Sequence, residues 1–77
     1  AATVALYPNP TRGRLTIAST ASPLESVSVH DLQGREVLSL DAEGNAATLD
    51  LSGLNASVYF VRVVTQDGAV TKRIVKK

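Results

Sequence analysis

The sequence predicts an all-β protein, a seven-stranded antiparallel immunoglobulin-like β-sandwich. Apolar and polar residues alternate over several short runs, which is the pattern of strands that bury one face. Gly, Pro, Asn or Asp stands at nearly every junction between these runs, and no segment repeats apolar residues at helical spacing. Regular short strands separated by turns are typical of sandwiches and small barrels, and seven strands favour the immunoglobulin-like sandwich.

The most β-prone stretch is residues 57–65, which combine β-branched and aromatic residues with one charge and no Gly or Pro. Side chains alternate between the two faces of a strand, so the face without a charge should point into the core. That face carries Tyr59, Val61, Val63 and Thr65. The other face is still largely apolar, although Arg62 lies in it, so we expect this strand in the interior of its sheet.

Residues 1–6 are predicted to be the end of an upstream linker or a first short strand, with the strand over Thr3–Leu6, and residues 7–77 are predicted to form a single domain. Tyr7–Gly13 contains two prolines, each of which fixes φ at about −65° and pushes the preceding residue toward extended backbone. This segment should therefore be a fixed corner and not a helix. The next strand, Arg14–Ser19, should turn two side chains inward, Leu15 and Ile17.

A hairpin is predicted in the middle of the chain. A strand over Leu24–Asp31 and a second over Arg35–Asp41 are joined by the turn Leu32-Gln33-Gly34. The first strand should direct Val27 and Val29 inward.

The remaining strands follow from the same alternation. In Arg35–Asp41, two leucines should lie on the face opposite Val37 and Ser39; they are Leu38 and Leu40. Ala42–Asn45 is predicted to close a second hairpin into residues 47–51, whose inward side chains are Ala47, Leu49 and Leu51. Asp67-Gly68 should return the chain into a last strand over residues 69–75.

Composition excludes several kinds of partner. The 77 residues contain no cysteine and have a formal net charge of +1. Neither a disulfide nor a zinc–thiolate site can form, and the charge does not support binding to nucleic acid or a membrane surface. A chain this short buries only about 60% of its unfolded surface, so its margin of stability is thin.

The residues offer no catalytic, cofactor or metal site. Ser28, His30 and Asp31 resemble triad components, but on a strand Asp31 points to the face opposite the other two. Asp41–Asn45 places oxygen-bearing side chains at alternating positions, yet it lacks the distal glutamate and the glycine position of a calcium loop. We therefore predict that the protein is not an enzyme and needs no cofactor.

Three motifs, in this order along the chain, resemble the C-terminal sorting domain of the type IX (Por) secretion system of Bacteroidetes. They are Tyr7-Pro8-Asn9-Pro10-Thr11-x-Gly13, then Val27-x-Val29-x-Asp31-Leu32-x-Gly34-Arg35-x-Val37, then Leu51-x-x-Leu54-x-x-x-Val58-Tyr59-Phe60-Val61-Arg62-Val63, which continues to the basic end Thr71-Lys72-Arg73-Ile74-Val75-Lys76-Lys77. Together they cover nearly the whole chain. One position departs from the family pattern: Ser57 stands where the family usually has Gly, and a positive φ there would cost serine about 1 kcal/mol or more.

The resemblance implies an address function. Such a domain ends a larger cargo protein that passes through the periplasm, and the outer-membrane translocon recognises the folded domain and exports the cargo to the cell surface or medium. A sortase-like peptidase then typically removes the domain. On this reading the cut falls in or before Ala1–Leu6.

The residues proposed to be recognised fall into three groups. They are the corner (Tyr7, Pro8, Asn9, Pro10, Gly13), the turn (Asp31, Gly34, Arg35) and the basic end (Lys72, Arg73, Lys76, Lys77). Each group also has a structural interpretation, as a loop between strands, a hairpin turn, and a charged edge strand that resists aggregation.

Two other functions remain open from the sequence. One is a fibronectin-like or carbohydrate-binding adhesion module, although three aromatic residues are a poor supply for sugar binding. The other is a structural appendage that stabilises its cargo. An exposed edge strand would also allow a strand-exchanged dimer.

Overall fold

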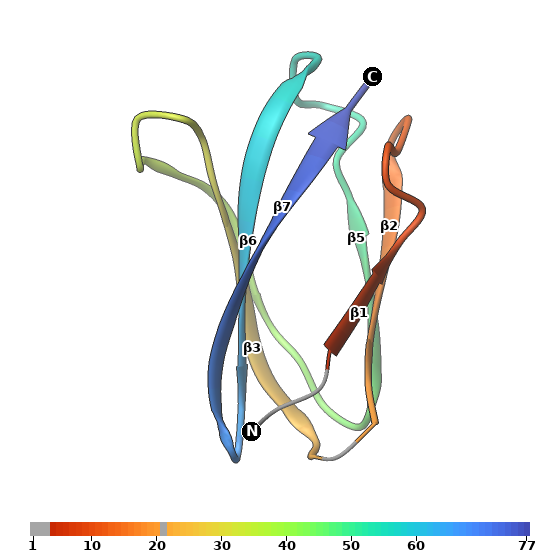
Figure 1. The fold of residues 1–77 in the computed structure, drawn as a ribbon, viewed down its shortest axis with the longest axis vertical. Coiled ribbons are helices and arrows are strands. Elements are labelled where there is room, and N and C mark those ends of the chain that lie inside the picture. Colours follow the sequence, from red (N-terminus) through yellow and green to blue (C-terminus); the bar gives the residue numbers. More distant parts are fainter. Residues whose placement is uncertain (1–3, 21) are drawn as a thin grey trace.

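The computed structural model describes residues 4–20 and 22–77 and shows seven strands and no helix within them (Figure 1). The predicted strand start at Thr3 lies outside these residues. The strands are β1 (Val4–Tyr7), β2 (Arg14–Ser19), β3 (Leu24–His30), β4 (Glu36–Asp41), β5 (Ala46–Asp50), β6 (Ser57–Thr65) and β7 (Gly68–Lys76). The all-β, seven-stranded prediction is confirmed. No helix in the described ranges could cross a membrane.

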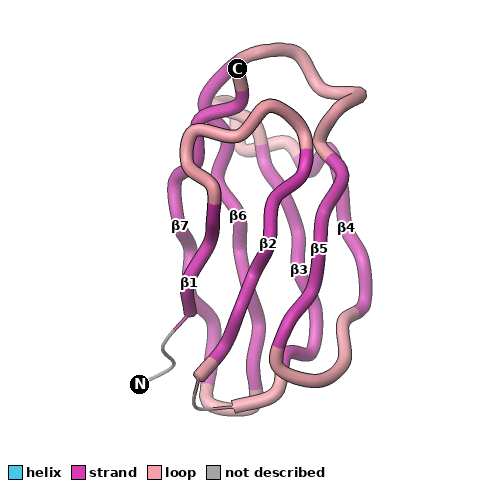
Figure 2. Tube along the Cα trace, turned by 90° about the vertical axis from the view of Figure 1, so that its right-hand side faces the viewer, coloured by secondary structure: helices cyan, strands magenta, loops and turns pink. Residues whose placement is uncertain are grey.

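The strands form two sheets packed face to face. One sheet has the order β1-β2-β5 and the other the order β4-β3-β6-β7, with antiparallel pairing throughout. Figures 1 and 2 show the strands running up and down the long axis. As a result, one end of the sandwich holds three connections and the C-terminal residue. The connections are residues 8–13, 31–35 and 51–56. β1 starts at the other end.

The core lies between the two sheets and follows the predicted alternation. Leu15 and Ile17 of β2 face Val27 and Val29 of β3, and all four are buried. β6 is an interior strand, as predicted, with its charge-free face buried. The hydroxyl of Tyr59 reaches the rim of the core and donates to the carbonyl of Asn55 at 2.7 Å, which fixes the loop before β6.

The predicted second hairpin is wrong. β4 and β5 lie in different sheets, so Ala42–Asn45 crosses from one sheet to the other. The backbone of this connection bonds to β3 and to the end of β2: the carbonyl of Gly44 accepts from Leu24 at 2.8 Å, and that of Asn45 accepts from Ser19 at 2.7 Å. The turn residues were recognised correctly, and Gly44 has a φ of 72°. Turn chemistry, however, does not say which sheet the next strand joins.

The predicted faces of β4 also need a correction. Val37 packs against the core together with Leu38, although alternation put them on opposite faces. The cause is a bulge in β4 beside the end of β3, where Val29 pairs with Leu38 but His30 pairs with Glu36. Val37 is the extra residue of this bulge, and the local twist turns it toward the core.

Candidate recognition surface

The corner between β1 and β2 lies along the free edge of β7. The side chain of Asn9 imitates a strand backbone there: its amide nitrogen donates to the carbonyl of Arg73 at 3.3 Å, and its oxygen accepts from the N–H of Val75 at 3.0 Å. Thr11 continues the pairing through its backbone, donating to Val75 at 2.9 Å and accepting from Lys77 at 2.8 Å. The corner therefore acts as a short parallel strand on the last part of β7.

The corner has an internal support of its own. The hydroxyl of Thr11, which is almost fully buried, donates to the carbonyl of Arg14 at 2.7 Å and accepts from the N–H of Gly13 at 3.1 Å. Gly13 lies against Ser52, and a Cβ at Gly13 would sit 3.4 Å from the Cβ of Ser52. Its carbonyl accepts from Leu51 at 2.6 Å. The corner is thus fixed to β7 on one side and to the end of β5 on the other.

The predicted corner and basic-end residues form one surface. We call residues 7–13 together with residues 73–77 the corner–terminus surface. It brings together Tyr7, Pro8, Asn9, Pro10 and Gly13 with Arg73, Lys76 and Lys77. Ile74 in its centre is buried, which anchors the basic strand to the core.

Lys72 lies before the part of β7 that the corner covers, because the hydrogen bonds of the corner reach Arg73, Val75 and Lys77. It pairs with Val61, whose side chain points into the core, and paired residues share a face of the sheet. Lys72 is exposed because β7 is an edge strand. An inward-facing charge on an edge strand is a known protection against sheet-to-sheet aggregation. For Lys72 the edge-protection interpretation therefore fits better than a place on the corner–terminus surface.

The third predicted group is a turn held by one carboxylate. Asp31 Oδ1 accepts from the N–H of Gln33 at 2.9 Å and from that of Arg35 at 3.0 Å, and Oδ2 accepts from Arg35 Nε at 3.1 Å. Gly34 has a φ of 83°, which favours glycine, and its N–H donates to the carbonyl of Asp31. The N–H of Arg35 foremost, with that of Gln33 and the Arg35 charge, holds the pKa of Asp31 below its ordinary value of 3.8.

This turn is at the same end of the sandwich as the corner–terminus surface but at the opposite edge of its sheet. It joins β4 to β3, whereas the corner covers β7, and β6 lies between. The structure therefore gathers two of the three predicted groups and leaves the turn apart (Figure 1).

Two apolar side chains at this end of the sandwich are exposed. Leu32 at the tip of the turn is 64% exposed, and Tyr7 at the start of the corner is 53% exposed. Tyr7 was predicted, but Leu32 was not. The sequence position of Leu32 indicated this exposure, because a leucine inside a tight turn cannot reach the core.

The described part of the chain contains no cluster of His, Cys, Asp or Glu that could hold a metal ion. Its buried side-chain polar atoms all have a hydrogen-bond partner. Ser57 has no positive φ, because every described residue with a positive φ is a glycine. The departure from the family pattern at this position therefore carries no backbone strain.

Replacing Asn9 should release the end of β7 without unfolding the domain. Asn9→Ala removes two exposed hydrogen bonds, worth together about 1–2 kcal/mol, and leaves the N–H of Val75 open to solvent. We expect faster amide hydrogen exchange at Val75 while amides in the interior of β6 keep their protection. Asn55→Ala, in an exposed position at the same end, is the control. An unchanged rate of amide exchange at Val75 in Asn9→Ala would contradict the proposed role of Asn9 in holding β7.

The Asp31 turn should make stability depend on pH. Because the pKa of Asp31 is lowered by folding, its contribution is fully present above about pH 4–5 and is lost as pH falls through 3.8 and past the folded-state pKa. Denaturant unfolding at pH 6 and pH 3 should show a smaller difference for Asp31→Asn than for the parent chain. Glu43→Gln, an exposed carboxylate in another connection, should keep the parental difference. Equal differences for Asp31→Asn and parent would refute the assignment.

Comparison with known proteins agrees with this geometry. The family model of the secretion system C-terminal sorting domain matches residues 5–77, essentially the whole domain. No curated protein matches the chain. The match begins inside β1 and includes the corner, the Asp31 turn and β7, so it covers every element described above. The chain belongs to the secretion system C-terminal sorting domains, the C-terminal secretion signals of type IX cargo proteins.

Proposed function

We propose that the outer-membrane translocon of the type IX system recognises the corner–terminus surface. One observation carries this proposal: Asn9 bonds to residues 64 and 66 positions away in the chain. Together with the two Thr11 bonds, this contact turns the basic end of the chain into a fixed strand with a defined neighbour. A receptor that bound this surface would meet one conformation.

The fixed conformation matters for affinity. Ordering a flexible side chain on binding costs about 0.5–1.5 kcal/mol, and ordering the backbone of a loose tail adds to this. In this domain the ordering has already occurred on folding. Asn9 and Thr11 are positioning residues in this account, and Tyr7, Arg73 and Lys77 supply the exposed contacts.

The turn supplies a second, separate contact. Asp31 and Gly34 hold its shape, so their role is structural. The exposed groups are the Leu32 side chain and the guanidinium of Arg35, whose side chain is 76% exposed. A receptor with an apolar recess and an acidic rim would match them.

The position of the N-terminal end supports a cargo joined upstream. β1 begins with Val4 at the end of the sandwich opposite the corner–terminus surface (Figure 1). A cargo attached before Val4 would leave that surface free in the periplasm and during export to the cell surface or medium. Because Val4 is buried in β1, we place the peptidase cut before Val4, and N-terminal sequencing of the released domain tests this. The domain itself acts in recognition and not in catalysis.

The export test uses charge substitutions, because deleting residues 72–77 would also remove buried Ile74 and unfold the domain. A reporter with a periplasmic signal peptide carries the domain at its C-terminus in a type IX-competent bacterium. Changing Arg73, Lys76 and Lys77 to Gln should lower export about tenfold or more, since complementary charges steer association. The folded fusion should accumulate in the periplasm.

A second triple variant removes the same charge elsewhere. It changes Arg14, Arg62 and Lys72 to Gln, and it should be exported at the parental level. Normal export of the first variant would mean that its basic residues only protect the edge. Equal loss in both variants would mean that total charge matters and not this surface.

A further inference from the structure

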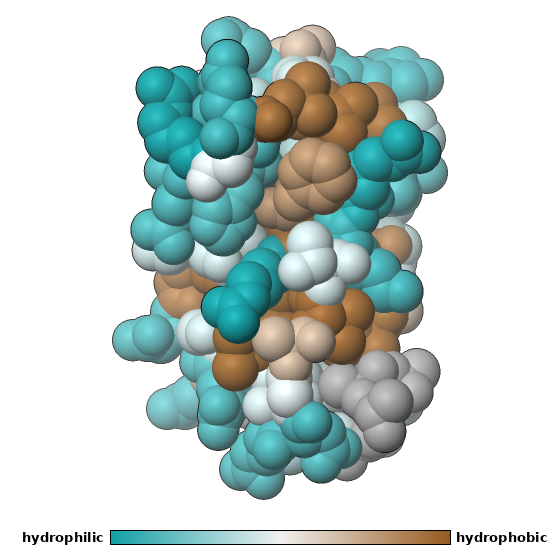
Figure 3. Space-filling model, turned by 60° about the vertical axis from the view of Figure 1, so that its left-hand side comes forward, coloured by the Kyte–Doolittle hydropathy of each residue, from teal (hydrophilic) through white to brown (hydrophobic). Residues whose placement is uncertain are grey.

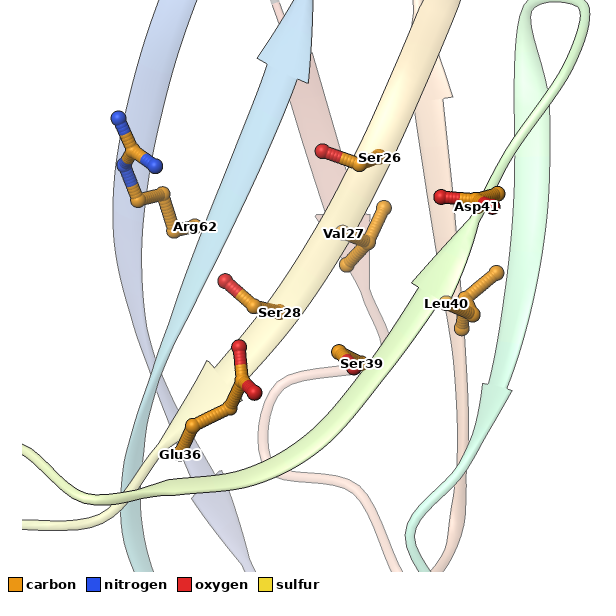
Figure 4. Close-up of a pocket in the computed structure, with 8 residues that line it drawn as sticks. All are labelled: Ser26, Val27, Ser28, Glu36, Ser39, Leu40, Asp41 and Arg62. Carbon is orange, nitrogen blue, oxygen red and sulfur yellow. The ribbon is translucent and has the colours of Figure 1, made fainter.

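A polar hollow lies on the outer face of the four-stranded sheet, away from the corner–terminus surface. It has a volume of about 380 Å³ and crosses β4, β3 and β6 (Figure 4). Three hydroxyls, two carboxylates and one guanidinium line it, from Ser26, Ser28, Ser39, Glu36, Asp41 and Arg62. The register explains the gathering, because Ser28 pairs with both Ser39 and Arg62, and Ser26 pairs with Asp41.

The side chains in the hollow are arranged around open space. Figure 4 shows Ser26 and Ser28 directed to the side from which Arg62 rises, and the carboxylate of Glu36 reaching toward Ser28. Arg62 forms no ion pair with either carboxylate, since the single ion pair in residues 4–20 and 22–77 joins Arg35 to Asp31. The guanidinium and the two carboxylates therefore line the same hollow without forming an ion pair with one another.

The charges exclude several ligand classes. Two carboxylates against one guanidinium give a net negative charge, which disfavours phosphate and other anions. Arg62 disfavours a metal ion, and no metal-ligand cluster occurs in the described residues. The polar lining disfavours an apolar ligand, because it would strip water from groups that gain no partner. A neutral ligand with many hydroxyls fits, since each hydroxyl both donates and accepts.

An apolar ring lies near the hollow, beyond the residues that line it. Phe60 lies two residues before Arg62 on the same face of β6, so their Cα atoms are about 7 Å apart. Phe60 pairs with His30 in the next row of the sheet and is only partly buried. Figure 3 shows apolar surface in the middle of this face, flanked by polar residues. A hexose has one apolar face of C–H groups that can lie on such a ring while its hydroxyls reach the hollow.

We propose that this hollow binds a neutral saccharide of one or two hexose units. Its volume is at the lower end of the range of about 300–1000 Å³ that is usual for small-molecule sites. Arg62, Glu36 and Ser28 supply the hydrogen bonds, and Phe60 supplies the stacking surface. The site uses different residues from the corner–terminus surface, although Phe60 pairs with Arg73 of that surface.

The test is an NMR titration of the 77-residue chain, labelled with nitrogen-15, against single sugars. The probes are glucose, galactose, mannose, N-acetylglucosamine, maltose and cellobiose, each up to about 50 mM, which would saturate a site with a dissociation constant of about 1 mM. We expect at least one of them to shift the amides of residues 26–30, 36–41 and 60–62 in a saturable way. The shifts should not change between low and high salt, because the ligand is neutral.

Two variants and one control make the result specific. Arg62→Gln and Ser28→Ala should each weaken binding about tenfold or more. The first variant loses a hydrogen bond from a charged group, and the second loses the hydroxyl that pairs with a ligand hydroxyl. Arg12→Gln, an exposed arginine in the corner, should bind like the parent. Unchanged dispersion of the other amides shows that each variant is folded.

Three results would overturn the proposal. One is the absence of a saturable shift with every sugar in the panel. Another is a shift that Arg62→Gln leaves intact. The third is a saturable shift of the same residues with inorganic phosphate but not with any sugar, which would make the hollow an anion site.

Discussion

The contact between Asn9 and the edge of β7 is the constraint that fixes the two ends of the chain to each other. A side-chain amide presents one donor and one acceptor in a plane, and here they meet the carbonyl of Arg73 and the N–H of Val75 as a neighbouring strand would. The contact links the two sheets at the open side of the sandwich, because Asn9 follows β1 of one sheet and β7 is the edge of the other. It also occupies the part of an edge that could otherwise pair with another chain.

This contact has particular weight in a small domain without disulfides. A chain of 77 residues with no cysteine has no covalent closure, and its core is limited to the space between two sheets of three and four strands. The corner supplies a non-covalent closure between the two ends of the chain. Buried Thr11 supports it from below, and Ile74 fixes the opposite strand to the core. The same contacts that complete the fold also shape the surface that we propose for recognition.

Much of the fold could be predicted from local pattern, and the failures have physical causes. The alternation in β6 gave its buried face and its interior position, because a strand flanked on both sides must be apolar on much of both faces. The change of sheet after β4 could not be predicted, since the residues of a turn fix its backbone but not the partner of the next strand. Val37 was misplaced because a bulge, which alternation cannot show, interrupts the period.

The candidate surface was predicted only in its parts. The motifs indicated the corner and the basic end as separate groups. The two groups lie together because the Asn9 side chain pairs with β7 as a strand backbone would. No spacing in the sequence indicates such pairing between residues so far apart. Lys72 is adjacent to Arg73 in the sequence, whereas the pleat puts their two side chains on opposite faces of β7. The polar hollow also needs register: its serines belong to two strands, and Arg62 to a third.

The most direct measurement is the destination of a reporter in a type IX-competent bacterium. A fluorescent protein with a periplasmic signal peptide is expressed with and without this domain at its C-terminus, and both the cell surface and the medium are assayed. The account predicts that only the fusion leaves the periplasm and that it loses about 8.1 kDa on the way, the mass of the domain. Retention of both proteins in the periplasm would contradict it.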